Sequence, residues 1–134
     1  MLAVRDLGSS KQLAWLPLNA ATASKTIAEL TCLFTIYGPP LVLKNDNGSA
    51  FSDEDMDRFL RSWGVTQLFS PPACPGYNGA CEASIRWLKV WTEAHAALPG
   101  RPGSWTTADT EAAVGYANEH VRAWRGHGPT REEV

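Results

Sequence analysis

Two carboxylates stand where their surroundings could put them to chemical use. Asp46 follows the short apolar run 41–43 and precedes Asn47 and Gly48, so a turn would leave it exposed at the end of a strand. Glu82 falls in the first turn of an expected helix, with thirty-five residues between positions 46 and 82. Hard cations such as Mg²⁺ and Mn²⁺ prefer oxygen ligands, and paired metals of this kind promote phosphoryl transfer. The two residues are therefore candidate metal ligands.

Each carboxylate also has a simpler interpretation. Asp-Asn-Gly is a common turn sequence, because Asp and Asn tolerate turn geometry and Gly accepts a positive φ. A Glu in the first turn of a helix often does no more than offset the helix dipole. A two-metal mechanism moreover needs about three carboxylates. Only the combination of Asp46, Glu82 and their flanking segments favours the chemical interpretation.

Composition indicates a globular domain and limits its partners. The chain has 134 residues, of which 44% are apolar and 19% are charged, as expected of a single folded domain. Its net charge of -2 disfavours nucleic-acid binding over the whole surface, so such binding is local, is supplied by other segments, or is absent. Three cysteines without a Cys-x-x-Cys pair argue against a disulfide scaffold and a zinc site. No signal peptide or membrane-length apolar run is present, which predicts a cytoplasmic protein without a membrane partner.

Hydrophobic periodicity predicts an α/β protein with an antiparallel hairpin first and crossover-connected strands afterwards. We expect residues 1–98 to form the main domain, and 99–134 to supply a linker and C-terminal helix of that domain. Ser52 is the expected cap of the second helix, and the strand at 41–43 is expected to be buried on both faces. The expected elements are strands 2–4, 12–18, 41–43 and 65–69, and helices 21–36, 52–64, 80–97 and 105–124.

Six sequence blocks carry a resemblance to a known family. They are Y-G-P-P at 37–40, L-K-N-D-N-G-S-A-F at 43–51, G-V at 64–65, F-S-P-P at 69–72, P-G-Y-N-G-A-C-E at 75–82 and L-K at 88–89. Together they resemble the catalytic core of retroviral integrases and DDE transposases, most closely those of bacterial insertion sequences. The resemblance covers about residues 2–97 and implies a ribonuclease-H-like mixed sheet flanked by helices.

The resemblance also implies an activity, a cofactor and partners. The activity is DNA integration or transposition by strand transfer that depends on Mg²⁺ or Mn²⁺, with DNA as partner and a homo-oligomer, such as a dimer, as the working form. Asp46 matches the family's second catalytic Asp and Glu82 its catalytic Glu, both as metal ligands. Arg86 and Lys89 share one helical face with Glu82. The implied DNA contacts are Arg86, Lys89, Asn47 and Asn78; an Arg86–Glu82 surface ion pair is the alternative for that face.

The chain departs from the family pattern at its beginning. Residues 2–11 resemble the family's second strand, so the first, central strand and the first catalytic Asp are expected to lie before Met1. Asp6 is then the end of a hairpin strand and not that Asp. The unpaired strand edges predict marginal stability or self-association, and the missing carboxylate predicts weak or absent catalysis. Ile85 stands where many relatives carry Asn.

Three functional hypotheses remain from the sequence. The first is a DNA strand transferase, impaired in this truncated chain. The second is a catalytically dead integrase-core remnant that acts as a DNA- or transposase-binding module. The third is a structure-selective nuclease of the same fold. The third carboxylate separates the first two, because without it we expect a single weak metal site.

Overall fold

A computed structural model describes residues 1–18, 20, 22–124 and 127–130 of the chain. The chain divides into two compact units. The first unit comprises Met1–Pro17 and Ala80–Val134, and the second comprises Leu18–Gly79. Asp46 therefore belongs to the second unit and Glu82 to the first. No helix among the described residues combines the length and apolar character needed to cross a membrane.

The first unit begins with the predicted antiparallel hairpin. Strand β1 (Leu2–Arg5) pairs with β2 (Gln12–Leu16), with Leu2 opposite Leu16 and Ala3 opposite Trp15. The Asp6 N–H donates to the Lys11 carbonyl at 2.9 Å and closes the connection. Gln12, Ala14 and Trp15 of β2 are all buried. Because neighbouring side chains of a strand point to opposite faces, Ala14 and Trp15 show that both faces of β2 are covered.

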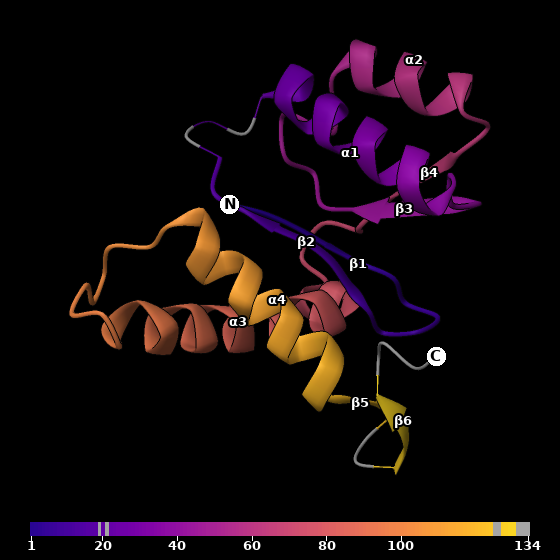
Figure 1. The fold of residues 1–134 in the computed structure, drawn as a ribbon. Helices are drawn as coiled ribbons and strands as arrows, with labels where there is room; N and C mark the ends of the chain where they lie inside the picture. The colour runs from indigo at the N-terminus through magenta and orange to yellow at the C-terminus, as the bar shows by residue number, and fades with distance from the viewer. Residues whose placement is uncertain (19, 21, 125–126, 131–134) are drawn as a thin grey trace. The chain divides into compact units, whose positions relative to one another are not determined.

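Two helices pack on this hairpin. Helix α3 (Gly79–Ala97) and helix α4 (Thr107–His120), labelled in Figure 1, meet it in a core. That core consists of Trp15, Leu88, Ala113 and Ala117. Leu88 lies four residues after buried Ser84 and four before buried Thr92, so one stripe of α3 faces inward. The stripe is partly polar, and its hydroxyls need partners inside the unit.

The C-terminal helix is shorter than the sequence predicts. The expectation of a helix through residue 124 is wrong, because α4 ends at His120 and Val121 already has extended backbone. Strand β5 (Arg122–Trp124) follows and pairs antiparallel with β6 (His127–Thr130). Strand β6 supplies hydrogen-bond partners to the backbone of β5. In a longer helix, the last backbone carbonyls would have no intrahelical partner.

The second unit contains a parallel strand pair and two helices. Strand β3 (Val42–Asn45) and strand β4 (Thr66–Phe69) run parallel in register, with Val42 opposite Thr66 and Asn45 opposite Phe69. Figure 1 shows α1 (Ala23–Tyr37) and the crossover helix α2 (Glu54–Ser62) on the same side of this pair. The predicted crossover connection is confirmed, and the mixed α/β fold class with it. A 3₁₀ turn, η1 (Pro75–Asn78), precedes α3.

Two local predictions in this unit are wrong. Asp53, not Ser52, caps α2, because its carboxylate accepts from the Asp55 N–H at 2.8 Å. Strand β3 is not buried on both faces, since Leu41 beside it is 88% exposed and Val42 is 51% exposed. Within the described residues β3 pairs with β4 alone, and its buried residue is the polar Asn45. An apolar run was therefore a poor guide to burial here.

Candidate metal and nucleic-acid site

Asp46 is held by a tight turn at the end of β3. Its Oδ1 accepts a hydrogen bond from the Gly48 N–H at 2.8 Å, and the side chain is exposed. A Cβ added at Gly48 would come within 2.9 Å of that same oxygen, closer than real Cβ contacts. Gly48 is therefore required where the sequence places it. Oδ2 of Asp46 has no hydrogen-bond partner among the described residues.

Buried Asn45 and Ser70 tie the ends of the two strands together beside Asp46. The Ser70 N–H and hydroxyl both donate to the Asn45 carbonyl, at 2.9 and 3.0 Å. The Asn45 amide donates to the Asp46 carbonyl at 2.6 Å, and its oxygen accepts from Gln67 at 3.1 Å. These bonds fix the backbone on which the Asp46 side chain stands.

Asn47 and Asn78, both predicted DNA contacts, also meet at Ser70. The Asn47 amide donates to the Ser70 carbonyl at 3.0 Å, and the Asn78 amide donates to the Ser70 hydroxyl at 2.5 Å. Their amide nitrogens therefore hold the loop after β4 to the Asp46 turn. DNA contact through their remaining amide oxygens stays a prediction. No role for Ser70 was predicted from the sequence, although the F-S-P-P block contains this residue.

The loop before α3 is anchored to β3 as well. The Lys44 ammonium donates to the Tyr77 carbonyl and lies 3.8 Å from the centre of the Tyr77 ring. Such a contact combines a hydrogen bond with a cation–π attraction. Lys44, Asn47 and Asn78 thus join the D-N-G and P-G-Y-N-G segments within the second unit.

Glu82 lies in the first turn of α3, as predicted, and that turn is fixed at both ends. Two residues before it, the Ala80 carbonyl accepts from the Arg5 guanidinium at 2.7 Å. Two residues after it, the Ser84 hydroxyl donates to the buried Gln12 side chain at 2.9 Å. The Glu82 side chain itself is exposed and has no partner in the part of the chain that the structure describes.

Gln12 is the centre of this anchoring network. Its side-chain amide donates to the Val4 and Ala14 carbonyls at 3.0 and 2.9 Å. Its backbone exchanges two hydrogen bonds with the Asn118 side chain, at 2.8 and 2.9 Å. Each polar atom of Gln12 is thereby satisfied, and β2, α3 and α4 are held together around it.

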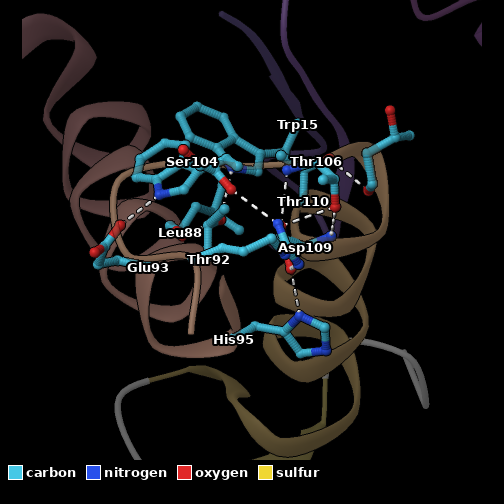
Figure 2. Close-up of polar contacts among 12 residues, drawn as sticks. Trp15, Leu88, Thr92, Glu93, His95, Ser104, Thr106, Asp109 and Thr110 are labelled. Atoms are coloured by element: carbon cyan, nitrogen blue, oxygen red, sulfur yellow. Dashed lines mark hydrogen bonds and ion pairs between the residues drawn. The ribbon is translucent and has the colours of Figure 1, made fainter. Parts of the chain in front are cut away.

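A second polar cluster fixes the far end of α3. Figure 2 shows Asp109 of α4 between His95 and the Thr106 cap, with the Trp15 indole donating to the Thr92 hydroxyl at 3.0 Å nearby. The fully buried Asp109 carboxylate accepts from Arg101 at 3.0 and 3.2 Å and lies 2.7 Å from His95 Nδ1. Arg101 first, then His95 and the Thr106 N–H, hold the pKa of Asp109 well below its usual range. The helix that carries Glu82 is thus secured along its whole length.

Arg86 and Lys89 are exposed on α3, on the helical face they share with Glu82. No ion pair joins Arg86 to Glu82 among the described residues, so the alternative of a surface pair is not what the structure shows. Ile85 is partly buried against the core of Trp15 and Leu88. The apolar side chain at this position therefore serves packing within the first unit.

Asp6 is occupied by the hairpin turn. Its Oδ2 accepts from the Ser9 N–H at 2.7 Å and from the Ser9 hydroxyl at 2.5 Å. These bonds lower the pKa of Asp6, the hydroxyl of Ser9 contributing most. The carboxylate closes a turn of its own chain segment, as expected of a residue at the end of a hairpin strand.

The carboxylates suit a hard divalent cation. Asp46 and Glu82 are exposed and each offers at least one oxygen without a protein partner, which is the donor chemistry that Mg²⁺ and Mn²⁺ select. Among the described residues no group of three or more His, Cys, Asp and Glu side chains is positioned to hold a metal. That the two carboxylates share one cation stays a prediction.

Comparison with solved structures decides the fold. The chain superimposes over 98% of its length on the catalytic core domain of bovine immunodeficiency virus integrase, with a TM-score of 0.77 and 22% sequence identity, covering 81% of that domain. This is the fold of a retroviral integrase catalytic core. The HTLV-2 integrase core solved with magnesium in a trimeric form matches over 94% of the chain and 77% of its own length, with a TM-score of 0.75 and 19% identity.

A larger assembly gives the same integrase-core fold. A chain of the simian T-cell lymphotropic virus intasome, solved with the PP2A regulatory subunit B56 gamma, matches over 98% of this chain with a TM-score of 0.82 and 19% identity. Only 46% of that intasome chain is covered. The ribonuclease-H-like fold predicted from the sequence is confirmed. The bacterial insertion-sequence type stays a prediction, because these neighbours are viral.

Two curated relatives are Pol polyproteins or related to them. The Pro-Pol polyprotein of feline foamy virus is 32% identical over 109 residues, or 80% of this chain. The mouse intracisternal A-particle Pol-related polyprotein is 33% identical over 75 residues, or 56% of this chain. The chain spans about a tenth of the length of these relatives, 9% in each case. No family model matches the chain.

Proposed function

We propose that this chain is the catalytic core of a DNA integrase or transposase, acting by metal-dependent strand transfer. The observation that carries the proposal is the match of nearly the whole chain to integrase catalytic cores, including the magnesium complex of the HTLV-2 core. The Pro-Pol relative supports it at the level of sequence. Cysteines that form no disulfide fit the reducing cytoplasm, which we propose as its compartment.

Asp46 and Glu82 are the proposed metal ligands of this core. A bound Mg²⁺ or Mn²⁺ would supply Lewis-acid stabilisation of charge on the phosphoryl oxygens. The turn at Gly48 and the anchored first turn of α3 hold the two carboxylates toward solvent, ready to bind a cation. Two carboxylates are one fewer than a two-metal site needs, so the proposal includes a single weak site and slow turnover.

DNA is the proposed substrate and partner. Arg86 and Lys89 are exposed cations without ion-pair partners among the described residues, and they stand one and two turns after Glu82. Cations so placed suit phosphate oxygens of the backbone. Asn47 and Asn78 add amide oxygens near Asp46, where they could meet the sugar or base edges.

The test is Mn²⁺-dependent nicking and joining of labelled duplex DNA, with DNA binding measured in parallel. We expect slow, metal-dependent product formation that Asp46→Asn and Glu82→Gln each abolish while DNA binding persists. Asp6→Asn is the matched control, since it removes a carboxylate that the hairpin uses and should keep the activity. If Asp6→Asn folded normally but lost activity, the assignment of Asp46 and Glu82 as the metal ligands, with Asp6 outside the site, would be contradicted.

The alternative function is a binding module with the same fold and no catalysis. It rests on the small number of carboxylates, not on a separate binding surface. DNA binding that is independent of Mn²⁺, weakens in Arg86→Ala and Lys89→Ala, and yields no cleavage would favour it. A chain that neither binds nor cuts DNA in any divalent metal would rule out both functions.

A further inference from the structure

The loop of residues 70–78 joins β4 to α3 and has a backbone that cannot hold its own shape. Pro71 and Pro72 have no N–H group to donate, and both are exposed. Ala73 has a φ of 58°, in the left-handed region that favours glycine. Such a conformation persists only where the surrounding structure holds it. The loop therefore needs contacts from outside itself to keep one shape.

Lys44 of β3 provides such a contact. Its ammonium donates to the Tyr77 carbonyl and lies 3.8 Å from the centre of the Tyr77 ring, and we call this pair the Lys44–Tyr77 contact. Both residues are partly buried, which strengthens a cation–π attraction relative to an exposed pair. The Asn78–Ser70 hydrogen bond closes the loop on itself, whereas Lys44 reaches it from 33 positions away in sequence. The Lys44–Tyr77 contact thus fastens the loop to β3.

Lys44 makes this contact although a carboxylate lies nearer in sequence. Asp46 stands two residues after Lys44, yet no ion pair joins the two within the part of the chain that the structure describes. The Asp46 carboxylate accepts from the Gly48 N–H instead and stays exposed. Tyr77, for its part, stands five residues before Glu82. The contact therefore links the chain segments that lead into both candidate metal ligands, and it leaves Asp46 available to a cation.

We propose that Lys44 and Tyr77 are positioning residues for DNA strand transfer, which act through the shape of the loop. A loop that is already held in shape loses less conformational freedom when DNA binds, so the DNA is bound more tightly. Neither side chain has to touch the DNA or the metal ion for this effect. The role in the reaction rests on the proposed function, whereas the hold on the loop does not.

The hold on the loop is tested by hydrogen exchange with mass spectrometry, in the absence of DNA and metal. Tyr77→Leu removes the ring and Lys44→Met removes the cation, and each should speed the exchange of the loop amides at least about threefold. Tyr77→Phe keeps the ring and the carbonyl, and Lys44→Arg keeps the cation, so both should exchange like wild type. Lys25→Met is the matched control, because it removes an exposed lysine of α1. Unchanged loop exchange in Tyr77→Leu and Lys44→Met would overturn the proposal.

The role in the reaction is tested by Mn²⁺-dependent strand transfer on labelled duplex DNA, with unaltered exchange in α1 as the check that each variant is folded. Tyr77→Leu and Lys44→Met should each raise KM about threefold or more and leave kcat within about twofold. The double variant should be no worse than either single variant, because the contact is lost in all three.

Two results would separate this proposal from its alternatives. A KM that rises in Lys44→Met but not in Tyr77→Leu would make Lys44 a direct phosphate contact and contradict the positioning role. Faster loop exchange in both variants, together with no strand transfer by the unsubstituted chain, would refute the proposed function and the positioning role with it. The hold of Lys44 on the loop would then stand by itself.

Discussion

The two candidate carboxylates are positioned by different kinds of structure. Glu82 stands on a helix whose side chains enter a buried core and whose polar groups are satisfied by Gln12 and Arg5. Asp46 stands on a turn, held by one backbone N–H and by the Ser70 link between two short strands. Packing and a buried polar network fix the first; local hydrogen bonds fix the second. We infer that the backbone around Glu82 is held more firmly than the backbone around Asp46.

The surroundings of the two carboxylates differ in the same sense. The first unit buries polar side chains such as Gln12, Thr92 and Asp109, each with hydrogen-bond partners. The second unit has a buried core of its own, which includes Met56 and Leu60, but Leu41 beside β3 is exposed. Buried satisfied networks specify a unique arrangement, whereas exposed side chains contribute little to it. Substitutions should therefore cost more stability at the buried positions than at the exposed ones beside Asp46.

The largest contrast is expected between two leucines. Leu88→Ala removes a side chain at the centre of the first unit's core and should cost about 2–5 kcal/mol in the free energy of unfolding. Leu41→Ala, its matched control, alters a side chain that is 88% exposed and should change that free energy by less than about 0.5 kcal/mol. Urea unfolding followed by tryptophan fluorescence measures both. Equal costs would contradict the placement of Leu88 in the core and of Leu41 on the surface.

The next largest effect on stability is expected at Asp109, the buried carboxylate of the first unit. Asp109→Asn weakens the Arg101 and His95 contacts and should lower the midpoint of thermal unfolding by on the order of 5 °C or more. Because folding lowers the pKa of Asp109, its contribution is present above an unfolded pKa of about 4 and is lost as pH falls further. Wild-type stability should then fall more steeply with acid than that of Asp109→Asn. Glu111→Gln, an exposed neighbour, is the control; parallel pH profiles for wild type and Asp109→Asn would contradict this role.

A smaller effect is expected at the start of α2 in the second unit. Asp53→Ala removes the side chain that accepts from the Asp55 N–H and should cost about 1 kcal/mol. Ser52→Ala removes a hydroxyl bonded to the Gly48 carbonyl and should cost less. Chemical denaturation distinguishes the two. If Ser52→Ala cost more than Asp53→Ala, the cap would belong to Ser52 after all.

Regular patterns allowed much of the fold to be predicted. The hairpin, the crossover pair β3–β4 and the starts of α1 and α3 follow from alternation and helical spacing, and the D-N-G and P-x-x-N-G-x-x-E blocks pointed to the fold. Long-range pairing was not predictable from local sequence. Periodicity predicted helix at the residues that form β5, which instead pairs with β6. In and beside β3, polar Asn45 is buried, whereas apolar Leu41 and Val42 are exposed. Burial depends on which elements cover a strand, which a run of apolar letters does not reveal.

The candidate site shows the same division. The turn at Asp46 and the helix start at Glu82 were predictable because each depends on nearby residues. The Gln12–Ser84 and Arg5–Ala80 contacts join positions 72 and 75 residues apart, so no local sequence pattern predicts them. Ser70 became visible only once Asn45, Asn47 and Asn78 were seen to converge on it.

The most direct test of the central claim is a Mn²⁺ titration followed by electron paramagnetic resonance. If Asp46 and Glu82 ligate one cation, wild type will show a single weak site that Asp46→Asn and Glu82→Gln each remove, and that Asp6→Asn leaves in place. A Mn²⁺ site that survives both substitutions, or two tight sites on this chain, would contradict the account.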